Sequence, residues 1–406
     1  MMFRTVFLET FKKLYRNKKN RLLFLLAFIG IILYSFLYLP TVNNPLTIDA
    51  DELALETESA YGMKESRLAE GDIAVNSFTG VDTYSLAKYD YENNFMFYDA
   101  LQKGDISRLF ELKSTDYVPM FTVDALNDYL ERKHDGQFLD MDFERAVINN
   151  NLFALSEIDH PTTHEFNGKT GIQQLYSFFL NYGPLILLFI TIFVASEVLV
   201  DDRKHHTLKA GQPLGWRKYI FYQSVSVFIF IATGIAFFLM FFFLLISLLY
   251  GFGDMSLLTT HYAYTEGYRA AEENFFTAPV IDLILESLIL TAVLLYLFIR
   301  LNAVLSLIFR HDVIVMIAGF AIIAFNRLYS GGGEDRFLGL GAHLFPQNYF
   351  EFGNILSGRQ NFLTLSNNFT FETGIMVLLI TIIIIEIILG LLAGWMTRQK
   401  FVRQVD

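Results

Sequence analysis

Long apolar runs separated by polar segments are the feature that most restricts how this chain can fold. The six runs are residues 22–39, 175–199, 219–250, 281–309, 313–325 and 375–395. A helix needs roughly 20 apolar residues to cross the hydrocarbon core of a bilayer, and most of these runs reach that length. The 42 Phe and 21 Tyr suit lipid-facing helices and interfacial belts. The sequence therefore predicts an all-α polytopic membrane protein with six transmembrane helices.

The same pattern predicts where the spans and their connections lie. We expect the spans at residues 22–40, 174–200, 219–250, 279–309, 313–328 and 373–396. The third and fourth runs exceed about 25 residues, so these helices are expected to tilt or bend. The remaining segments are a cytoplasmic amphipathic helix at 1–21, a mostly helical extracellular domain at 41–173, a cytoplasmic loop at 201–218, an extracellular loop at 251–278, an extracellular or re-entrant segment at 329–372 and a cytoplasmic tail at 397–406.

The distribution of charge predicts the orientation of the spans. The flanks assigned to the cytoplasm, residues 1–21, 201–218, 300–312 and 397–406, hold seventeen Lys and Arg against five acids. Residues 251–278 hold one Arg and four acids and are expected outside. Because short cytoplasmic flanks carry an excess of Lys and Arg, both termini are predicted to be cytoplasmic. The apolar run after residue 21 is long and lacks a small-residue cleavage site, so a surface helix is favoured over a signal peptide.

The polar stretch at 41–173 is strongly acidic, with 25 Asp and Glu against 10 Lys and Arg. Its apolar residues recur at helical spacing, and helix-start signals stand at Thr122 and Asp140. We therefore expect a folded helical domain and not a disordered linker. The chain has no cysteine, so this domain folds without disulfides. The lack of cysteine also favours a bacterial protein, in the cytoplasmic membrane.

The segment after the second apolar run holds the most informative motif. That run ends at Glu197, and a charged stretch containing Arg203 leads to Thr207 and Leu208. Pro213 and Arg217 then open the third run. Such a short, rigid element between two spans can dock on a soluble partner and transmit its motion. The alternative is a solvated loop whose basic residues only anchor the topology.

This motif resembles the type 2 permease family of ATP-binding-cassette exporters. The matching residues are Glu197, Arg203, Thr207, Leu208, Pro213 and Arg217, while His206 stands where the family usually has Gly and Gln223 where it often has Lys. The basic N-terminal helix, the six spans and the Pro346-to-Tyr349 loop before the last span extend the resemblance. The resemblance implies a dimer of permeases, identical or paired, with two cytoplasmic ATPases that contact the 201–218 link as a coupling loop. ATP would be used by those partners and no cofactor by this chain.

Two motifs that could hold a nucleotide or a metal are unconvincing. Gly168-Lys169-Thr170 lacks the glycine that a phosphate-binding loop needs five positions earlier, because that position is Thr163. His160 and His164 are four residues apart, but Pro161 disfavours a regular helix through both. We therefore expect ATP hydrolysis on a separate subunit, no metal site and no enzymatic activity in this chain.

Three acidic residues fall inside apolar runs, where a charge is costly and usually functional or paired. Asp282 and Glu286 are four residues apart near the outer end of the fourth run, and Glu386 lies midway along the sixth. They either line a polar translocation path or are satisfied locally, by outer water or within a helix interface. Arg300 is expected to reach the inner surface from a tilted fourth helix.

The resulting hypothesis is the membrane-spanning permease subunit of an ATP-driven exporter, with an amphipathic peptide or lipid-like molecule as its substrate. Its partners would be the ATPases, a second permease and the lipid membrane, and no nucleic acid. Two alternatives from other classes remain open: a membrane-anchored receptor or immunity protein, and an envelope scaffold without transport activity.

Overall fold

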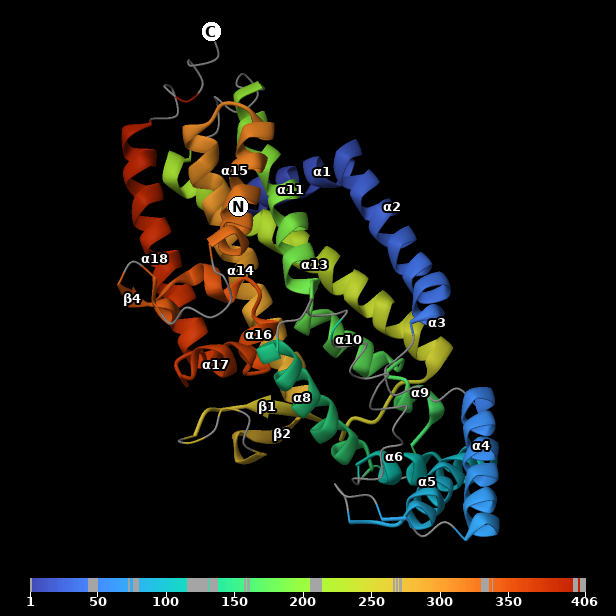
Figure 1. The fold of residues 1–406 in the computed structure, drawn as a ribbon. Helices are drawn as coiled ribbons and strands as arrows, with labels where there is room; N and C mark the ends of the chain where they lie inside the picture. Colours follow the sequence, from blue (N-terminus) through green and yellow to red (C-terminus); the bar gives the residue numbers. More distant parts are fainter. Residues whose placement is uncertain are drawn as a thin grey trace.

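The computed structural model describes the protein as a helical bundle with a second group of helices at one end (Figure 1). The described residues are 2–42, 50–71, 74–75, 80–114, 131, 138–156, 158, 161–204, 214–265, 267, 269, 272–329, 336–337, 339–396 and 401. Five helical stretches are long and apolar enough to cross a membrane, and they are Lys18–Thr41, Gly183–Asp202, Trp216–Tyr250, Val280–Ile308 and Phe371–Trp395. The chain is therefore a multi-pass membrane protein.

The predicted fifth span is the one that falls short. The apolar part of helix α15 (Asp312–Tyr329) is only Asp312–Phe325, which is shorter than any of the five candidate spans. At 1.5 Å per residue, that part rises roughly 20 Å, less than the roughly 30 Å hydrocarbon core. The structure therefore supports five spans in the described part of the chain, where the sequence predicted six.

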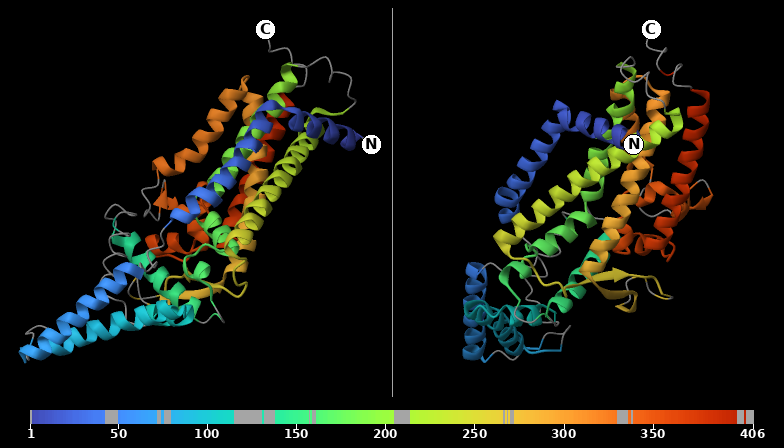
Figure 2. Two further views of the ribbon diagram at one scale, coloured as in Figure 1. Left: turned by 90° about the vertical axis from the view of Figure 1, so that its right-hand side faces the viewer. Right: turned by 180° about the vertical axis from the view of Figure 1, so that it is seen from behind.

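The central helix of the bundle is α14 (Val280–Ile308), because it packs against most of the other long helices. Its neighbours are α11 (Gly183–Lys204), α13 (Trp216–Tyr250), α15 and α18 (Phe371–Trp395). Most α14 side chains from Leu290 to Leu307 are buried. In α2 (Lys18–Leu33), by contrast, only Asn20 is buried, and α2 stands at the edge of the bundle (Figure 2).

The two ends of the bundle differ. α1 (Met2–Arg16) lies across the end where α18 finishes, and it meets α2 at Asn17 (Figures 1 and 2). Its buried residues Val6, Thr10 and Leu14 recur every four residues, so one face packs on α13. The opposite end carries the helices that lie between the first two spans.

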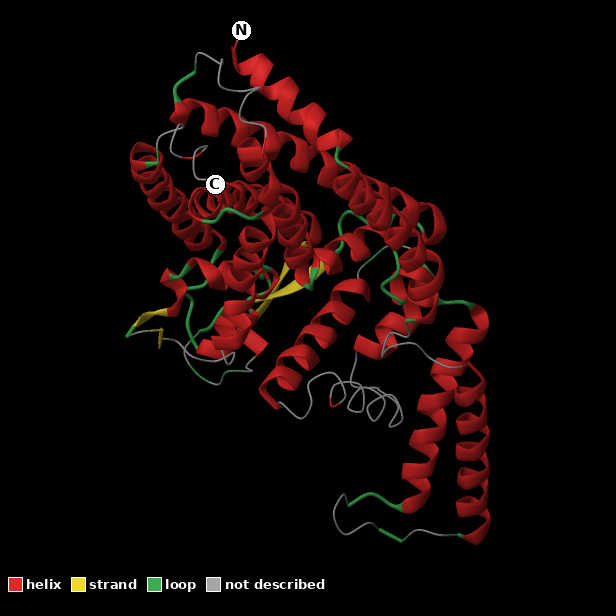
Figure 3. Ribbon diagram, turned by 90° about the horizontal axis from the view of Figure 1, so that it is seen from above, coloured by secondary structure: helices red, strands yellow, loops and turns green. Residues whose placement is uncertain are grey.

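Those helices lie within the predicted polar domain and confirm that its described part is mostly helical. They are α4 (Ala50–Glu70), α5 (Thr83–Lys103), α6 (Ile106–Ser114), α8 (Phe138–Ser156) and α9 (Thr163–Phe166). α4 and α5 run side by side and project away from the bundle (Figures 2 and 3). Phe97 and Ala100 of α5 and Leu53 of α4 are fully buried, so an apolar core holds the base of this hairpin.

Short strands correct the all-α expectation. β1 (Leu258–Tyr262) pairs antiparallel with β2 (Phe275–Pro279), with Thr260 opposite Thr277. A smaller pair joins β3 (Arg336–Phe337) to β4 (Leu340–Gly341). β1 and β2 are rich in Thr and aromatic residues, which suit a half-buried pleated surface. That signal was present in the sequence, but the segment 251–278 was interpreted as a loop.

A compact cap precedes the last span. It consists of the 3₁₀ turns Ala342–Leu344 and Pro346–Tyr349 and the helices α16 (Gly353–Leu356) and α17 (Arg359–Thr364). A side chain at Gly353 would overlap the carbonyl of Leu180, and one at Gly358 would overlap that of Tyr262. The cap therefore packs backbone to backbone on the neighbouring α10 and β1. Residues 330–335, in the segment predicted to be extracellular or re-entrant, lie outside the described residues.

Candidate functional site

An open cleft of about 650 Å³ lies beside α2, whose rings Phe24 and Phe28 pack on α13 along one side of it. Its far walls come from α10 (Gly171–Leu180), α11 and α13. Most of the lining is aliphatic or aromatic, including Phe24, Leu187 and Ile235. Polar side chains gather in one part of the cleft, where Gln174, Ser177 and Asn181 of the α10 region lie. Small-molecule sites typically occupy ~300–1,000 Å³ and combine apolar walls with a few polar groups, which is the character of this cleft.

The near wall of the cleft is shaped by a break in helical regularity. The first span passes from α2 into a π-helical turn at Tyr34–Tyr38 before α3 (Leu39–Thr41). A π-turn widens the helix locally and often marks a functional position. It carries Tyr34 toward α10, where the Tyr34 hydroxyl donates to Gln174 Oε1 at 2.7 Å. The cleft therefore has a hydrogen-bonded end and an otherwise weakly packed near wall.

The far wall contains a second break. The predicted span 174–200 folds as two helices, α10 and α11, which are separated at Asn181 and Tyr182. A side chain on Gly183 would stand 2.2 Å from the Phe178 carbonyl oxygen, so only glycine fits this corner. Because the helix is interrupted here, Asn181 is exposed and lines the cleft.

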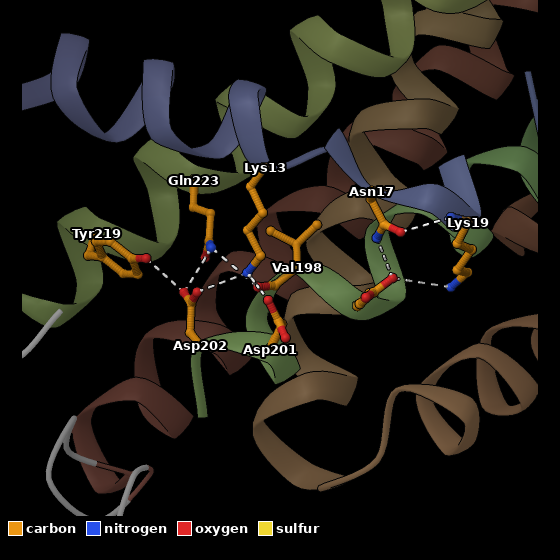
Figure 4. A network of polar contacts seen from close by, with 9 residues as sticks. Lys13, Asn17, Lys19, Val198, Asp201, Asp202, Tyr219 and Gln223 are labelled. Carbon is orange, nitrogen blue, oxygen red and sulfur yellow. Dashed lines mark hydrogen bonds and ion pairs between the residues drawn. The ribbon is translucent and has the colours of Figure 1, made fainter. Parts of the chain in front are cut away.

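A polar network joins α1 to α11 and α13 at the other end of the bundle (Figure 4). Lys13 Nζ lies 2.8 Å from Asp201 Oδ2 and 3.3 Å from Asp202 Oδ1. The Tyr219 hydroxyl donates to Asp202 at 2.7 Å, and Gln223 Nε2 donates to it at 2.9 Å. Asp202 is buried, and these three donors compensate for the loss of water around its carboxylate.

The same network continues to the junction of α1 and α2. Asn17 Nδ2 donates to Glu197 Oε2 at 2.8 Å, and Lys19 Nζ lies 3.7 Å from the same oxygen. Asn17 also caps α2 by accepting from the Lys19 backbone N–H. The position of the first span relative to α11 is therefore tied to carboxylates on α11.

The charge on Lys13 is maintained by its partners. Burial alone would lower the pKa of Lys13, but the negative charges and hydrogen bonds of Asp202 and Asp201 outweigh burial and raise the pKa. The ammonium therefore stays protonated throughout the physiological range, and the contact between α1 and α11 is an ionic one.

A second ionic contact lies inside the bundle. The Arg300 guanidinium on α14 binds both carboxylate oxygens of Glu386 on α18, with Nη2 to Oε2 at 2.6 Å. Arg300 Nη1 donates to Ser224 Oγ on α13 at 2.9 Å. The side chain of Arg300 is 2% exposed, so it does not reach the membrane surface as the sequence suggested. A bidentate pair of this kind satisfies both charges within the apolar layer.

The three acids that were predicted to line one path are not brought together. Asp282 is exposed, and Glu286 lines a separate cavity of about 250 Å³ with Glu372 and His261. Glu286 stands fourteen residues before Arg300, which is roughly 20 Å along a helix from the Glu386 pair. Glu386 is paired with Arg300 at the interface between α14 and α18, and its role in a translocation path stays a prediction.

The predicted coupling residues are only partly described. Glu197 lies in the network at Asn17 and Lys19. Arg217 is exposed at the start of α13. Its Nη2 atom lies 2.8 Å from the position that a Cβ atom on Gly394 would occupy. Arg203 is in the last turn of α11, whereas Thr207, Leu208 and Pro213 lie outside the described residues.

His160 of the candidate metal motif lies outside the described residues, and the described residues of the two motifs make local contacts. Thr170 forms a capping box with Gln173 at the start of α10, and Lys169 donates to the Pro40 carbonyl at 3.2 Å. Glu165 forms the equivalent box with Thr162, and the His164 ring packs edge-on against Tyr250. Over the described ranges, no group of three or more His, Cys, Asp or Glu is arranged to hold a metal ion.

One family model matches. It is the serpentine type 7TM GPCR chemoreceptor Srz, and it matches residues 147–260, less than half of the chain. The matched stretch includes α10, α11 and α13, which form the far walls of the cleft. No curated protein and no solved structure matches the chain.

This match contradicts the exporter-permease interpretation. The resemblance to the type 2 permeases depended on six residues around the 201–218 link and on a general layout of spans. The family match instead covers that link together with both helices beside it and points to a receptor class. The expected ATPase partners, the second permease and the export function depended on the permease resemblance and are withdrawn with it.

Sequence reasoning missed most of the residues that form these sites. Lys13 was counted only as a topology anchor, and Arg300 was expected at the surface. One usable signal existed for the network, because Asp201 and Asp202 end an apolar run in a chain whose N-terminal helix is basic. No comparable signal marked Tyr34 or Asn181 as cleft residues.

Proposed function

We propose that this chain is a multi-pass membrane receptor that binds a lipid-soluble ligand in the cleft behind α2. The observation that carries the proposal is the cleft itself, about 650 Å³ between helices long enough to span a membrane. One wall, α2, is largely exposed, so the cleft opens toward the lipid side of the bundle. A ligand dissolved in the membrane can enter it without crossing a packed core.

The family match supports a receptor over a scaffold. The matched residues 147–260 include α10, α11 and α13, the three helices that line the cleft opposite the first span. The family is described as one of serpentine chemoreceptors with seven transmembrane helices. The number of spans is not carried over, because the family has seven and the described part of this chain has five candidate spans. Only the receptor class is carried over to this chain.

The polar network supplies the link from ligand to response. A ligand in the cleft contacts α2, and α2 is tied through Asn17 and Lys19 to Glu197 on α11. A displacement of α2 therefore changes the contacts of α1, whose Lys13 binds Asp201 and Asp202. By the distribution of Lys and Arg, this end of the bundle is the cytoplasmic one. The receptor would thus report occupancy of the cleft at its cytoplasmic face.

The absence of cysteine gives a direct test of this proposal. Spin labels at Leu26→Cys on α2 and Leu391→Cys on α18 lie on exposed positions on different helices. The protein is reconstituted in phosphatidylcholine nanodiscs, and the distance between labels is measured by pulsed electron resonance with a panel of single-chain amphiphiles. A receptor shifts the distance distribution with at least one amphiphile, and the shift is lost in Gly30→Phe, which fills the cleft.

The control is Gly390→Phe on α18. Gly390 also has open space around it, but it does not line the cleft. This variant should respond as the parent does. If no amphiphile moves α2 in the parent, or if both glycine variants lose the response equally, the receptor proposal is wrong.

A further inference from the structure

The chemistry of the cleft lining restricts the ligand. Among the described residues that line it, none carries a carboxylate, an ammonium, a guanidinium or an imidazole group. All its polar side chains are hydroxyls and amides. We infer that the cleft binds an uncharged amphiphile, with a hydroxyl- or amide-type head and a single apolar chain. This inference rests on the receptor proposal and specifies its ligand class.

The polar part of the cleft can both donate and accept hydrogen bonds. Asn181 Nδ2 donates to the Ser177 carbonyl at 2.8 Å and to the Ser177 Oγ at 3.1 Å, and Asn181 is exposed, so its Oδ1 can accept a hydrogen bond from a ligand. The Ser177 hydroxyl retains its own proton to donate. Gln174 is engaged by Tyr34 and by the Gly168 carbonyl, so it holds the wall in place. A head group that is both donor and acceptor matches Asn181 and Ser177.

The rest of the cleft suits a single chain. From Tyr34 to Leu23 the near wall runs along α2 for eleven residues, or roughly 16 Å. The far wall opposite carries Leu187, Ile190 and Ile235. Gly30 leaves room between the helices, since a side chain there would meet nothing within 4 Å, whereas Gly234 faces the Phe24 ring, which would lie 3.4 Å from a side chain on it. The space is therefore elongated and apolar beyond the polar end.

A charged head is disfavoured by this lining. Among the described residues that line the cleft none offers a counter-charge, so a charged head would exchange its water for hydroxyls and amides alone, which costs free energy. The apolar chain adds little selectivity, because lipid tails are as apolar as the cleft walls. Discrimination therefore comes from the head group and from the shape of the cleft.

The test uses probes that share one chain and differ only in the head. Palmityl alcohol, palmityl sulfate and palmityltrimethylammonium each carry the same chain diazirine and alkyne, and the two ionic heads keep their charge at any pH. The full-length protein in phosphatidylcholine nanodiscs is irradiated with each probe. Labelled peptides are then mapped by mass spectrometry, with unlabelled palmityl alcohol as competitor.

The alcohol is expected to label peptides of α2, α10 or α11 at least 10-fold more than either charged probe, and unlabelled alcohol should compete. Asn181→Leu and Ser177→Ala should each weaken that labelling by roughly 3- to 20-fold, the range for one hydrogen bond within a membrane. Gly30→Phe should abolish it, and Gly234→Leu, which fills the cleft from the opposite wall, provides a second blocking variant. Gly390→Phe should have no effect.

The possible failures separate the two proposals. Equal or stronger cleft labelling by a charged probe, with the same probe moving the spin label on α2, overturns the uncharged class and leaves the receptor intact. Labelling that is not competed, or that is spread evenly over all lipid-facing helices, means bulk lipid only and overturns the ligand inference. No cleft labelling by any probe together with an unmoved α2 overturns both.

Discussion

Removal of the Lys13 ammonium should release α1 from the bundle. In Lys13→Met, the buried Asp202 keeps Tyr219 and Gln223 as donors but loses its counter-charge. Loss of one partner from a fully buried pair costs about 3–5 kcal/mol, and an exposed pair is worth about 0.2–1 kcal/mol. Lys13 is 30% exposed and Asp202 is 6% exposed, so we expect about 2 kcal/mol.

Cysteine labelling can measure that magnitude directly. Leu14 is 3% exposed on the packed face of α1, so a maleimide reacts with Leu14→Cys only when α1 detaches. A cost of about 2 kcal/mol raises the detached fraction, and hence the labelling rate, by roughly 30-fold. Lys12→Met is the matched control, because Lys12 is exposed on the same helix. Equal rates in the Lys13 and Lys12 variants would refute the argument.

The pH dependence provides an independent check on the same contact. The pKa of Lys13 is raised in the docked state, so its stabilisation is complete below the ordinary lysine pKa of about 10.4. It is lost as the pH rises through the higher docked-state pKa. The labelling difference between parent and Lys13→Met should therefore be constant from neutral pH to about pH 10 and should shrink only above that.

Three further outcomes follow from individual contacts. Glu386→Leu should lower the yield of folded protein in detergent, because it leaves the buried Arg300 without its counter-charge. The double variant with Arg300→Met should restore much of that yield. An unchanged yield in the single variant would contradict the ion pair. Gly183→Ala should destabilise the corner between α10 and α11 by about 1–3 kcal/mol, whereas Gly62→Ala, in open space on α4, should be neutral or slightly stabilising in thermal unfolding. Burial lowers the pKa of His261, so its contribution to stability should decline as pH falls below about 6.5; unfolding of His261→Gln should lack that component.

The membrane class was predictable from the sequence because hydropathy is a local property. An apolar run of sufficient length can cross a membrane as a helix whatever it packs against, and five of the described helical stretches are long and apolar enough to do so. The helical character of α4, α5 and α8 was likewise predictable from local spacing and cap residues. The short run at α15 stays a prediction as a span, since a run of this length also fits a buried or surface helix.

The sites were much less predictable. Asp282, Glu286 and Glu386 share a chemical type and a membrane location, and the sequence therefore suggested one path. The fold separates them and gives Glu386 a partner 86 residues away in the sequence. Likewise, the cleft depends on a π-turn at Tyr34 and a helix break at Asn181, neither of which has an unambiguous local signature.

By itself, the sequence determined that this chain is a multi-pass helical membrane protein with a polar, acidic region after its first span. Only the tertiary structure decided that Lys13 meets Asp202 across 189 residues and that α2 stands apart from α11 to leave a cleft. The physical reason is that lipid, and not water, surrounds the spanning helices. In lipid, apolar surface shows no preference among neighbouring helices, so polar contacts and close packing select the partners. Those contacts join distant residues and cannot be read from any single stretch of the chain.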